Sequence, residues 1–214
     1  MEVHKLNFKH HKSAPLFFEN ISFKLDAGKL HALHGKNGIG KTVLFHILSG
    51  KISSEAILEG EISNHKNVVL VNQRFDQMIA DKFSFAENLK FARMQFFPSP
   101  FQSLKEPQYF PELLEKFHID LNIPAFKLSG GQRQILSLMM VLQRKVEILL
   151  LDEPTAALDT LNAEMVFEFL QSLTKQNITL LVVCHDHDLI HRYATGSHLY
   201  LEKLTSDTRF VTIR

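Results

Sequence analysis

The sequence predicts an α/β fold with a mainly parallel sheet, an N-terminal antiparallel β-subdomain and an inserted helical subdomain. Short apolar segments of strand length alternate with segments of helical periodicity, which is typical of strand–helix–strand units. Residues 74–127 differ in composition, because they hold ten of the eighteen phenylalanines and are interrupted by Pro98, Pro100, Pro107 and Pro111. One domain of 214 residues is expected, with residues 1–73 and 128–214 as its core and residues 74–127 as the helical subdomain.

The first half of the chain is expected to hold most of the short strands. Residues 2–8 and 16–34 indicate strands with a turn at 27–28, and residues 30–34 lead directly into a glycine-rich loop. A helix is expected over residues 41–49, ended by the glycine that follows. Two further strands are expected at residues 57–63 and 67–71.

The second half alternates more regularly between helices and strands. Helices are expected over residues 130–144 and 160–175, and buried strands over residues 147–151 and 178–184. Residues 196–214 are typical of a two-stranded hairpin. Such alternation implies a parallel sheet, and parallel sheets bind ligands at the carboxyl ends of their strands.

The glycine-rich loop fits the phosphate-binding pattern G-x-x-x-x-G-K-[ST]. It lies between an expected strand and an expected helix, which is the context that this motif requires. Its backbone N–H groups and the positive end of the helix can surround the phosphates of a nucleotide. We expect Lys41 to reach the β and γ phosphates and the Thr42 hydroxyl to bind magnesium. The expected nucleotide-binding residues of this loop are Gly35, Lys36, Asn37, Gly38, Ile39, Gly40, Lys41, Thr42 and Val43.

Two adjacent carboxylates follow the apolar strand at residues 147–151. Asp152 lies at the tip of this strand, where a carboxylate can help to hold magnesium opposite the phosphate loop. Glu153 is the second carboxylate. The expected magnesium site therefore contains Asp152 and Thr42.

The segment Leu128–Gln132 reads Leu-Ser-Gly-Gly-Gln. This is the signature of the ATP-binding cassette (ABC) family, and the chain resembles an ABC ATPase over about residues 3–202. The resemblance implies that Glu153 polarises the attacking water as a general base, and that His185 contacts the γ phosphate as a switch histidine. It also implies that Gln73 contacts magnesium and the water, and hinges the helical subdomain.

The resemblance further implies that two subunits must face each other to hydrolyse ATP. The signature precedes a helix, so its N–H groups form a second anion site. By resemblance, this site binds the γ phosphate of an ATP held by Lys41 of the opposite subunit. The residues expected to act across the dimer in this way are Ser129, Gly130, Gly131, Gln132 and Asp159.

The chain departs from the family pattern at two positions. Val43 stands where a hydroxyl residue is usual, which removes one side-chain contact to phosphate but leaves the backbone contacts. Ala156 replaces a common serine in the loop of Asp159, which removes one hydrogen bond across the dimer.

The adenine base should stack on a flat ring near the N-terminus, because stacking accepts any π face. His10 takes the place of the usual tyrosine in the family pattern, and Phe8 and His11 are rival candidates. Among the other histidines, His34 is expected to pack near the phosphate loop, and His187 to lie on a solvated helix face.

Composition narrows the possible partners and compartments. A formal net charge of +1 provides no basic field that would attract nucleic acid, so no nucleic-acid partner is expected. The single cysteine, Cys184, excludes an internal disulfide and fits a reducing compartment. The N-terminus lacks the apolar run of a secretory signal, and the longest apolar stretch is too short to cross a bilayer.

The favoured function is therefore that of an ATPase subunit that powers a membrane ABC transporter, with ATP and Mg²⁺ as cofactors. Its expected partners are separate transmembrane permease chains and either a second copy of itself or a paralogous ATPase. It would lie on the cytoplasmic face of the inner or plasma membrane. The alternatives are an ABC ATPase without a membrane partner, such as one for iron–sulfur assembly, and a nucleotide-binding module without catalysis. The sequence leaves the cargo and the direction of transport open.

Overall fold

A computed structural model describes residues 1–63, 66–72, 78–94, 106–156 and 158–213. Contacts between residues divide the chain into two compact units, which are described separately below. The sheet unit comprises residues 1–72, 147–154 and 170–214, and the helical unit comprises residues 73–146 and 155–169.

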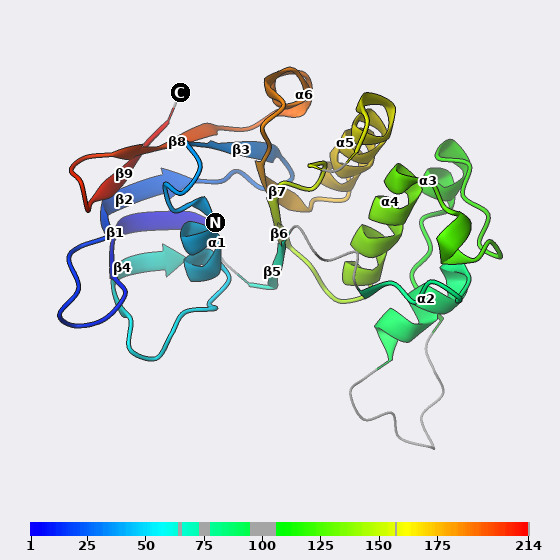
Figure 1. Ribbon diagram of the computed structural model, residues 1–214, viewed down its shortest axis with the longest axis horizontal. Coiled ribbons are helices and arrows are strands. Elements are labelled where there is room, and N and C mark those ends of the chain that lie inside the picture. The colour runs from blue at the N-terminus through cyan, green and yellow to red at the C-terminus, as the bar shows by residue number, and fades with distance from the viewer. Residues whose placement is uncertain (64–65, 73–77, 95–105, 157, 214) are drawn as a thin grey trace. The chain divides into compact units, whose positions relative to one another are not determined.

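The sheet unit contains one sheet of nine strands among the described residues, in the order β4-β1-β2-β9-β8-β3-β7-β6-β5 (Figure 1). The strands β3, β5, β6, β7 and β8 are parallel neighbours, whereas β1 pairs antiparallel with β2 and β4, and β8 with β9. Strand bounds are β1 Glu2–Lys9, β2 Phe18–Lys24, β3 Leu30–His34, β4 Ile57–Ser63, β5 Val68–Val71, β6 Ile148–Asp152, β7 Thr179–Val183, β8 His198–Lys203 and β9 Arg209–Ile213.

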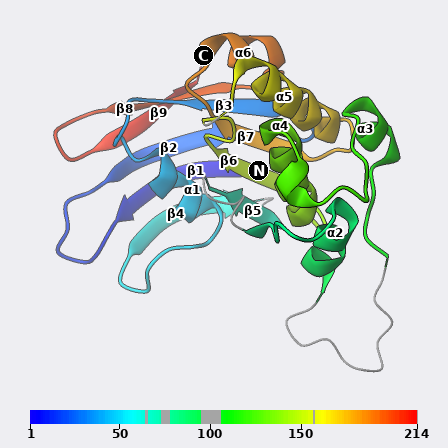
Figure 2. The same cartoon turned by 45° about the vertical axis from the view of Figure 1, so that its right-hand side comes forward.

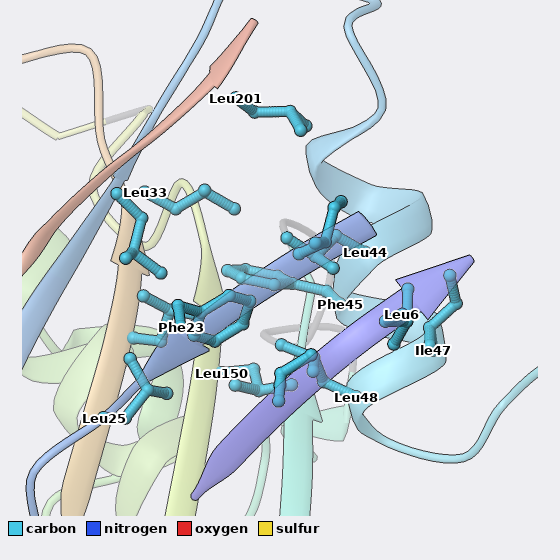
Figure 3. Packing of buried hydrophobic residues seen from close by; sticks show 14 of the residues in the cluster. Leu6, Phe23, Leu25, Leu33, Leu44, Phe45, Ile47, Leu48, Leu150 and Leu201 are labelled. Atoms are coloured by element: carbon cyan, nitrogen blue, oxygen red, sulfur yellow. The ribbon is translucent and has the colours of Figure 1, made fainter. Parts of the chain in front are cut away.

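The core of the sheet unit lies between α1 (Lys41–Leu48) and the sheet. Figure 3 shows Phe45 and Leu48 of α1 pointing toward Phe23 of β2 and Leu150 of β6. Phe45 is completely buried. Burial of such side chains is the main force that fixes α1, and hence the loop before it, against the sheet. A short helix, α6 (His187–Tyr193), follows β7 in the same unit.

The helical unit contains α2 (Phe85–Arg93), α3 (Pro111–Lys116), a 3₁₀ turn (Ala125–Lys127) and α4 (Gly130–Val141). Figure 2 shows α2 and α4 as neighbours. Helix α5 (Thr160–Thr174) begins in this unit and ends in the sheet unit. Serine caps with complete capping boxes begin both α2 and α4, so local sequence explains where these helices start.

The predicted fold class is confirmed: the sheet is mixed but mostly parallel, and its N-terminal strands are antiparallel. The strand expected at residues 57–63 has these bounds, and the C-terminal hairpin is present as β8 and β9. The helix expected over residues 130–144 ends earlier, at Val141, with Leu142 as its C-cap residue.

Candidate functional site

The phosphate-binding loop connects β3 to α1, as the sequence predicted. Gly38 and Gly40 have φ values of 73° and 116°, in the region that favours glycine. At Gly40 a Cβ atom would also lie 2.8 Å from the Phe17 ring. Both glycines are therefore required by the shape of the loop.

Lys41 lies inside this loop and is only 8% exposed. Its ammonium group donates hydrogen bonds to the carbonyl oxygens of Gly35, at 2.7 Å, and Lys36, at 3.3 Å. Burial lowers the pKa of Lys41, and this effect is opposed by the carboxylates of Glu153 and Asp152. The loop thus holds a cation at its centre, surrounded by backbone.

Thr42 and Asp152 lie together at the ends of α1 and β6. The Thr42 hydroxyl donates to Asp152 Oδ2 over 2.7 Å. The sequence predicted both as magnesium ligands, and the structure brings their oxygen atoms side by side.

Glu153 and His185 meet at the carboxyl ends of the adjacent strands β6 and β7. Asp152 pairs with Val183 in this parallel ladder, and the Glu153 N–H donates to the Val183 carbonyl at 2.9 Å. Glu153 Oε1 lies 2.8 Å from His185 Nε2. The Glu153 side chain is 20% exposed and that of His185 is 55% exposed, so the pair lies at the surface of the sheet unit.

Glu153 has a positive φ of 54°, which non-glycine residues adopt rarely. Such conformations are costly and concentrate at functional sites. This backbone conformation was not predictable from the acidic pair in the sequence.

A group of stacked rings surrounds His34, the last residue of β3 before the phosphate loop. The His34 ring stacks on Tyr200 at 4.5 Å, on His198 at 5.2 Å and on His187 at 6.1 Å. His34 Nε2 also lies 3.0 Å from His198 Nδ1, within hydrogen-bond distance. Burial, with smaller effects of His198 and His187, lowers the pKa of His34 to about 4. His34 is thus a neutral residue of this group near neutral pH.

Acidification should therefore destabilise the fold through His34. Its folded pKa of about 4 lies below the ordinary histidine value of 6.5, so the unfolded chain binds the proton first. The stabilisation is complete above pH 6.5 and is lost as the pH falls toward 4. We expect His34→Gln to weaken the pH dependence of urea unfolding between pH 7 and 4.5, and the exposed-site control His4→Gln to leave it unchanged. Equal pH slopes for His34→Gln and the wild type would contradict this assignment.

An aromatic group lies beside the phosphate loop. His10 packs edge-on against Phe8 and Phe17, with ring centroids 5.0 and 4.8 Å apart. The Arg209 guanidinium lies over the Phe17 ring at 4.1 Å. Phe8 is buried and His10 is exposed, so His10 is the more accessible ring. Phe17 and Arg209 were missed: Phe17 could have been suspected from its position before β2, but no sequence signal indicates Arg209.

The signature segment begins α4 in the helical unit. Ser129 is the N-cap residue and forms a capping box with Gln132. Gly131 N–H donates at 2.9 Å, and the Ser129 hydroxyl at 3.1 Å, to Asn162 Oδ1. Asn162 in turn donates from its side chain and backbone to the Asp159 carboxylate, at 2.8 and 2.9 Å. The structure therefore brings Asp159 and the signature together through Asn162, which sequence reasoning missed.

Gln73 lies outside the described residues, so its expected role stays a prediction.

None of the helices in the described part of the chain has the length and apolar character that a bilayer-spanning helix needs.

The strand–loop–helix around Lys41, with a carboxylate pair at the end of β6, two strands from β3 in the sheet, defines a P-loop nucleotide-binding fold. The chain belongs to the ABC transporter family, whose sequence model matches residues 18–156.

Several relatives are ATP-binding proteins of transporters. The chain is 30% identical over 200 residues to the energy-coupling factor transporter ATP-binding protein EcfA of Methanococcus maripaludis, covering 85% of this chain and 69% of EcfA. It is also 30% identical over 198 residues to arabinose import ATP-binding protein AraG 1 of Burkholderia cenocepacia, covering 85% of this chain. The chain spans only 38% of the length of that arabinose protein.

Solved structures support the fold. The structure of cbiO1 from Clostridium perfringens, part of the ABC transporter complex cbiONQ, matches with a TM-score of 0.70 and 21% identity, covering 93% of this chain and 83% of cbiO1. The ADP conformation of the ATP-binding cassette MJ1267 matches with a TM-score of 0.67 and 20% identity, covering 94% and 87% of the two chains.

Proposed function

We propose that this chain is an ATP-binding and ATP-hydrolysing subunit that powers a membrane ABC transporter through ATP-driven dimerisation. The observation that carries this proposal is the grouping, within the sheet unit, of the Lys41 loop, the Thr42–Asp152 pair and the Glu153–His185 pair. Family membership and the transporter names of the relatives support it.

The Lys41 loop would bind the β and γ phosphates of ATP. In the structure, Lys41 Nζ is hydrogen-bonded to backbone carbonyls of the loop. Phosphate oxygens are charged acceptors and therefore stronger partners for an ammonium group than carbonyl oxygens are. A nucleotide can thus take over these bonds while the backbone N–H groups bind its other oxygens.

The residues present fit a magnesium ion bound together with ATP. Among the described residues there is no cluster of three or more His, Cys, Asp or Glu side chains suited to a metal. Mg²⁺ bound with a nucleotide needs only one or two protein ligands, since phosphates and waters complete its shell. The oxygens of Thr42 and Asp152, 2.7 Å apart, are of the required type. When bound, Mg²⁺ neutralises charge on the phosphates.

Glu153 would accept a proton from the attacking water as general base. A carboxylate within hydrogen-bond distance of an imidazole can be held in position by it, and His185 Nε2 lies at 2.8 Å. His185 can thus orient Glu153 before His185 itself contacts the γ phosphate. Gln73 would assist at the same water.

The adenine would lie against the aromatic group of His10 and Phe17. The Phe17 ring reaches Gly40 of the phosphate loop, so a base stacked in this region can belong to a nucleotide bound there. The His10 and Phe17 rings form a T-shaped pair with their centroids 4.8 Å apart, and the exposure of His10 leaves its ring accessible.

The signature would complete the site of an opposite subunit, either a second copy or a paralogue. Gly131 N–H and the Ser129 hydroxyl converge on one acceptor, at the N-terminus of a helix of 12 residues. Such an arrangement favours an anion. The transmembrane part would be a separate permease, which would hold the chain at the cytoplasmic face of a membrane.

ATP should draw the Glu153→Gln protein into a dimer, because each γ phosphate would bridge Lys41 of one subunit and Ser129 of the other. A ligand stabilises the state that binds it. Ser129→Glu places a carboxylate against that phosphate and should abolish the dimer, while ATP binding to the monomer stays within about twofold. Light scattering with ATP and Mg²⁺, and calorimetry of ATP binding, measure the two effects.

Asn122→Glu is a matched control, since Asn122 is an exposed residue of the same helical unit. It should dimerise like the parent protein. A Ser129→Glu variant that still dimerises with ATP would refute the two-subunit mechanism for this chain.

A further inference from the structure

Asn162 lies in the first turn of α5, and its side-chain oxygen accepts hydrogen bonds from two groups of the signature segment. Its Oδ1 accepts the Gly131 N–H at 2.9 Å and the Ser129 hydroxyl at 3.1 Å. These two donors are the groups that the proposed function assigns to the γ phosphate of the opposite subunit. A neutral amide oxygen therefore stands where a phosphate oxygen would be bound.

The capping box at the start of α4 does not include the Asn162 amide. The Ser129 hydroxyl oxygen already accepts the Gln132 N–H at 3.2 Å, and the Ser129 N–H donates to Gln132 Oε1 at 3.1 Å, so the capping box of α4 is complete. Asp159 Oδ1 accepts a hydrogen bond from the backbone N–H of Asn162 at 2.9 Å, which any residue except proline would supply at position 162. The Asn162 amide oxygen thus accepts from two donors that the Ser129–Gln132 capping box does not use, the Gly131 N–H and the Ser129 hydroxyl.

The nitrogen of the Asn162 side-chain amide is bound by Asp159. Asn162 Nδ2 donates to Asp159 Oδ2 at 2.8 Å, which fixes the direction of Oδ1. The hydrogen bonds from Asn162 lower the pKa of Asp159, so this residue stays a carboxylate at neutral pH and keeps its acceptor role.

Gly131 makes this approach possible. A Cβ atom at position 131 would lie 2.6 Å from Asn162 Oδ1 and 3.1 Å from Asn162 Cβ. The absence of a side chain at position 131 is thus explained by the close approach of Asn162, in addition to any approach of a ligand.

We infer that Asn162 is a positioning residue that holds Ser129 and Gly131 in the resting subunit and releases them to the γ phosphate of the opposite subunit. This inference rests on the proposed function. A phosphate oxygen is charged and forms stronger hydrogen bonds than a neutral amide does, so the exchange is favourable when ATP is present. After hydrolysis the phosphate leaves, Asn162 Oδ1 recovers both donors, and the separated subunits are stabilised relative to the dimer.

Two substitutions at position 162 should act in opposite directions. Asn162→Ala removes the competing acceptor, and in the Glu153→Gln background it should lower the dissociation constant of the ATP-bound dimer by about two- to tenfold. Asn162→Asp leaves an acceptor in place and adds a negative charge beside the incoming phosphate, so it should raise that constant by at least about tenfold. A merely structural role would weaken the dimer in both variants. Analytical ultracentrifugation with ATP and Mg²⁺ measures the constant, and Asn122→Ala and Asn122→Asp serve as matched controls.

Hydrogen exchange gives a second readout that needs neither ATP nor a dimer. In the nucleotide-free protein the Gly131 amide should be protected, and Asn162→Ala should remove this protection while the Ile135 amide, deeper in α4, stays protected. If Asn162→Asp does not fold, the dimer dissociation constant of Asn162→Ala and the hydrogen exchange of its Gly131 amide are sufficient to test the inference.

The outcomes separate the inference from the proposed function. A parent protein that dimerises with ATP while Asn162→Ala has the same or a higher dissociation constant would overturn the inference alone. Unchanged protection of Gly131 in Asn162→Ala would do the same. A Glu153→Gln parent that does not dimerise with ATP would overturn the proposed function and the inference with it.

Discussion

Replacement of Glu153 by glutamine is expected to leave ATP binding intact and to reduce hydrolysis by about a hundredfold or more, the contribution of a general base. Glutamine has the shape of glutamate and can keep a hydrogen bond to His185, which lies 2.8 Å from the native carboxylate. It cannot accept a proton from water at neutral pH. Phosphate release measured at saturating ATP reports the loss, and calorimetry reports the unchanged affinity.

Glu55→Gln is a suitable control for this experiment. Glu55 is exposed in the loop before β4, and its replacement removes the same charge without touching the site. Turnover of Glu153→Gln close to that of the control would show that the general base is another residue.

Replacement of Lys41 by alanine is expected to weaken ATP binding by about tenfold to a hundredfold, since hydrogen bonds to charged groups contribute about 1.5–3 kcal/mol. Lys41 is 8% exposed and its ammonium group is held by the loop carbonyls, so its charge is already oriented for phosphate. Calorimetry with ATP and Mg²⁺ measures the change.

Two further variants test whether a loss of affinity arises from the charge. Lys41→Met keeps most of the aliphatic stem and should show the same loss with a near-native thermal unfolding midpoint. Lys51→Ala removes an exposed charge just after α1 and should bind ATP normally. Unchanged affinity in both Lys41 variants would contradict the assignment of the phosphate loop.

The sequence predicted most of the sheet unit because its signals are local. The pattern from Leu30 to Leu48 contains an apolar strand, a fixed glycine spacing and an apolar helix face, and the structure has these elements at the expected places. Asp152 was predicted to lie near Thr42 because a parallel sheet brings strand ends and the phosphate loop to one edge. The division of the chain at residue 127 stays a prediction.

The missed features depend on contacts between distant residues or on backbone conformation. Phe17 and Arg209 are joined by a cation–π contact that depends on the pairing of β2 with β9. Asn162 has the sequence context of an ordinary residue in the first turn of a helix, and only tertiary packing brings it to Gly131. The Glu153–His185 pair depends on the register of β6 and β7, for which neither residue provides a sequence signal.

The left-handed backbone at Glu153 implies a trade-off between stability and activity at this position. A φ of 54° is unfavourable for glutamate and easily adopted by glycine. The native glutamate therefore lowers the free energy of unfolding compared with a residue that suits this conformation. Selection for folding alone would favour glycine or asparagine here. Stability engineering guided only by backbone preference would therefore yield a more stable protein that lacks the proposed catalytic carboxylate.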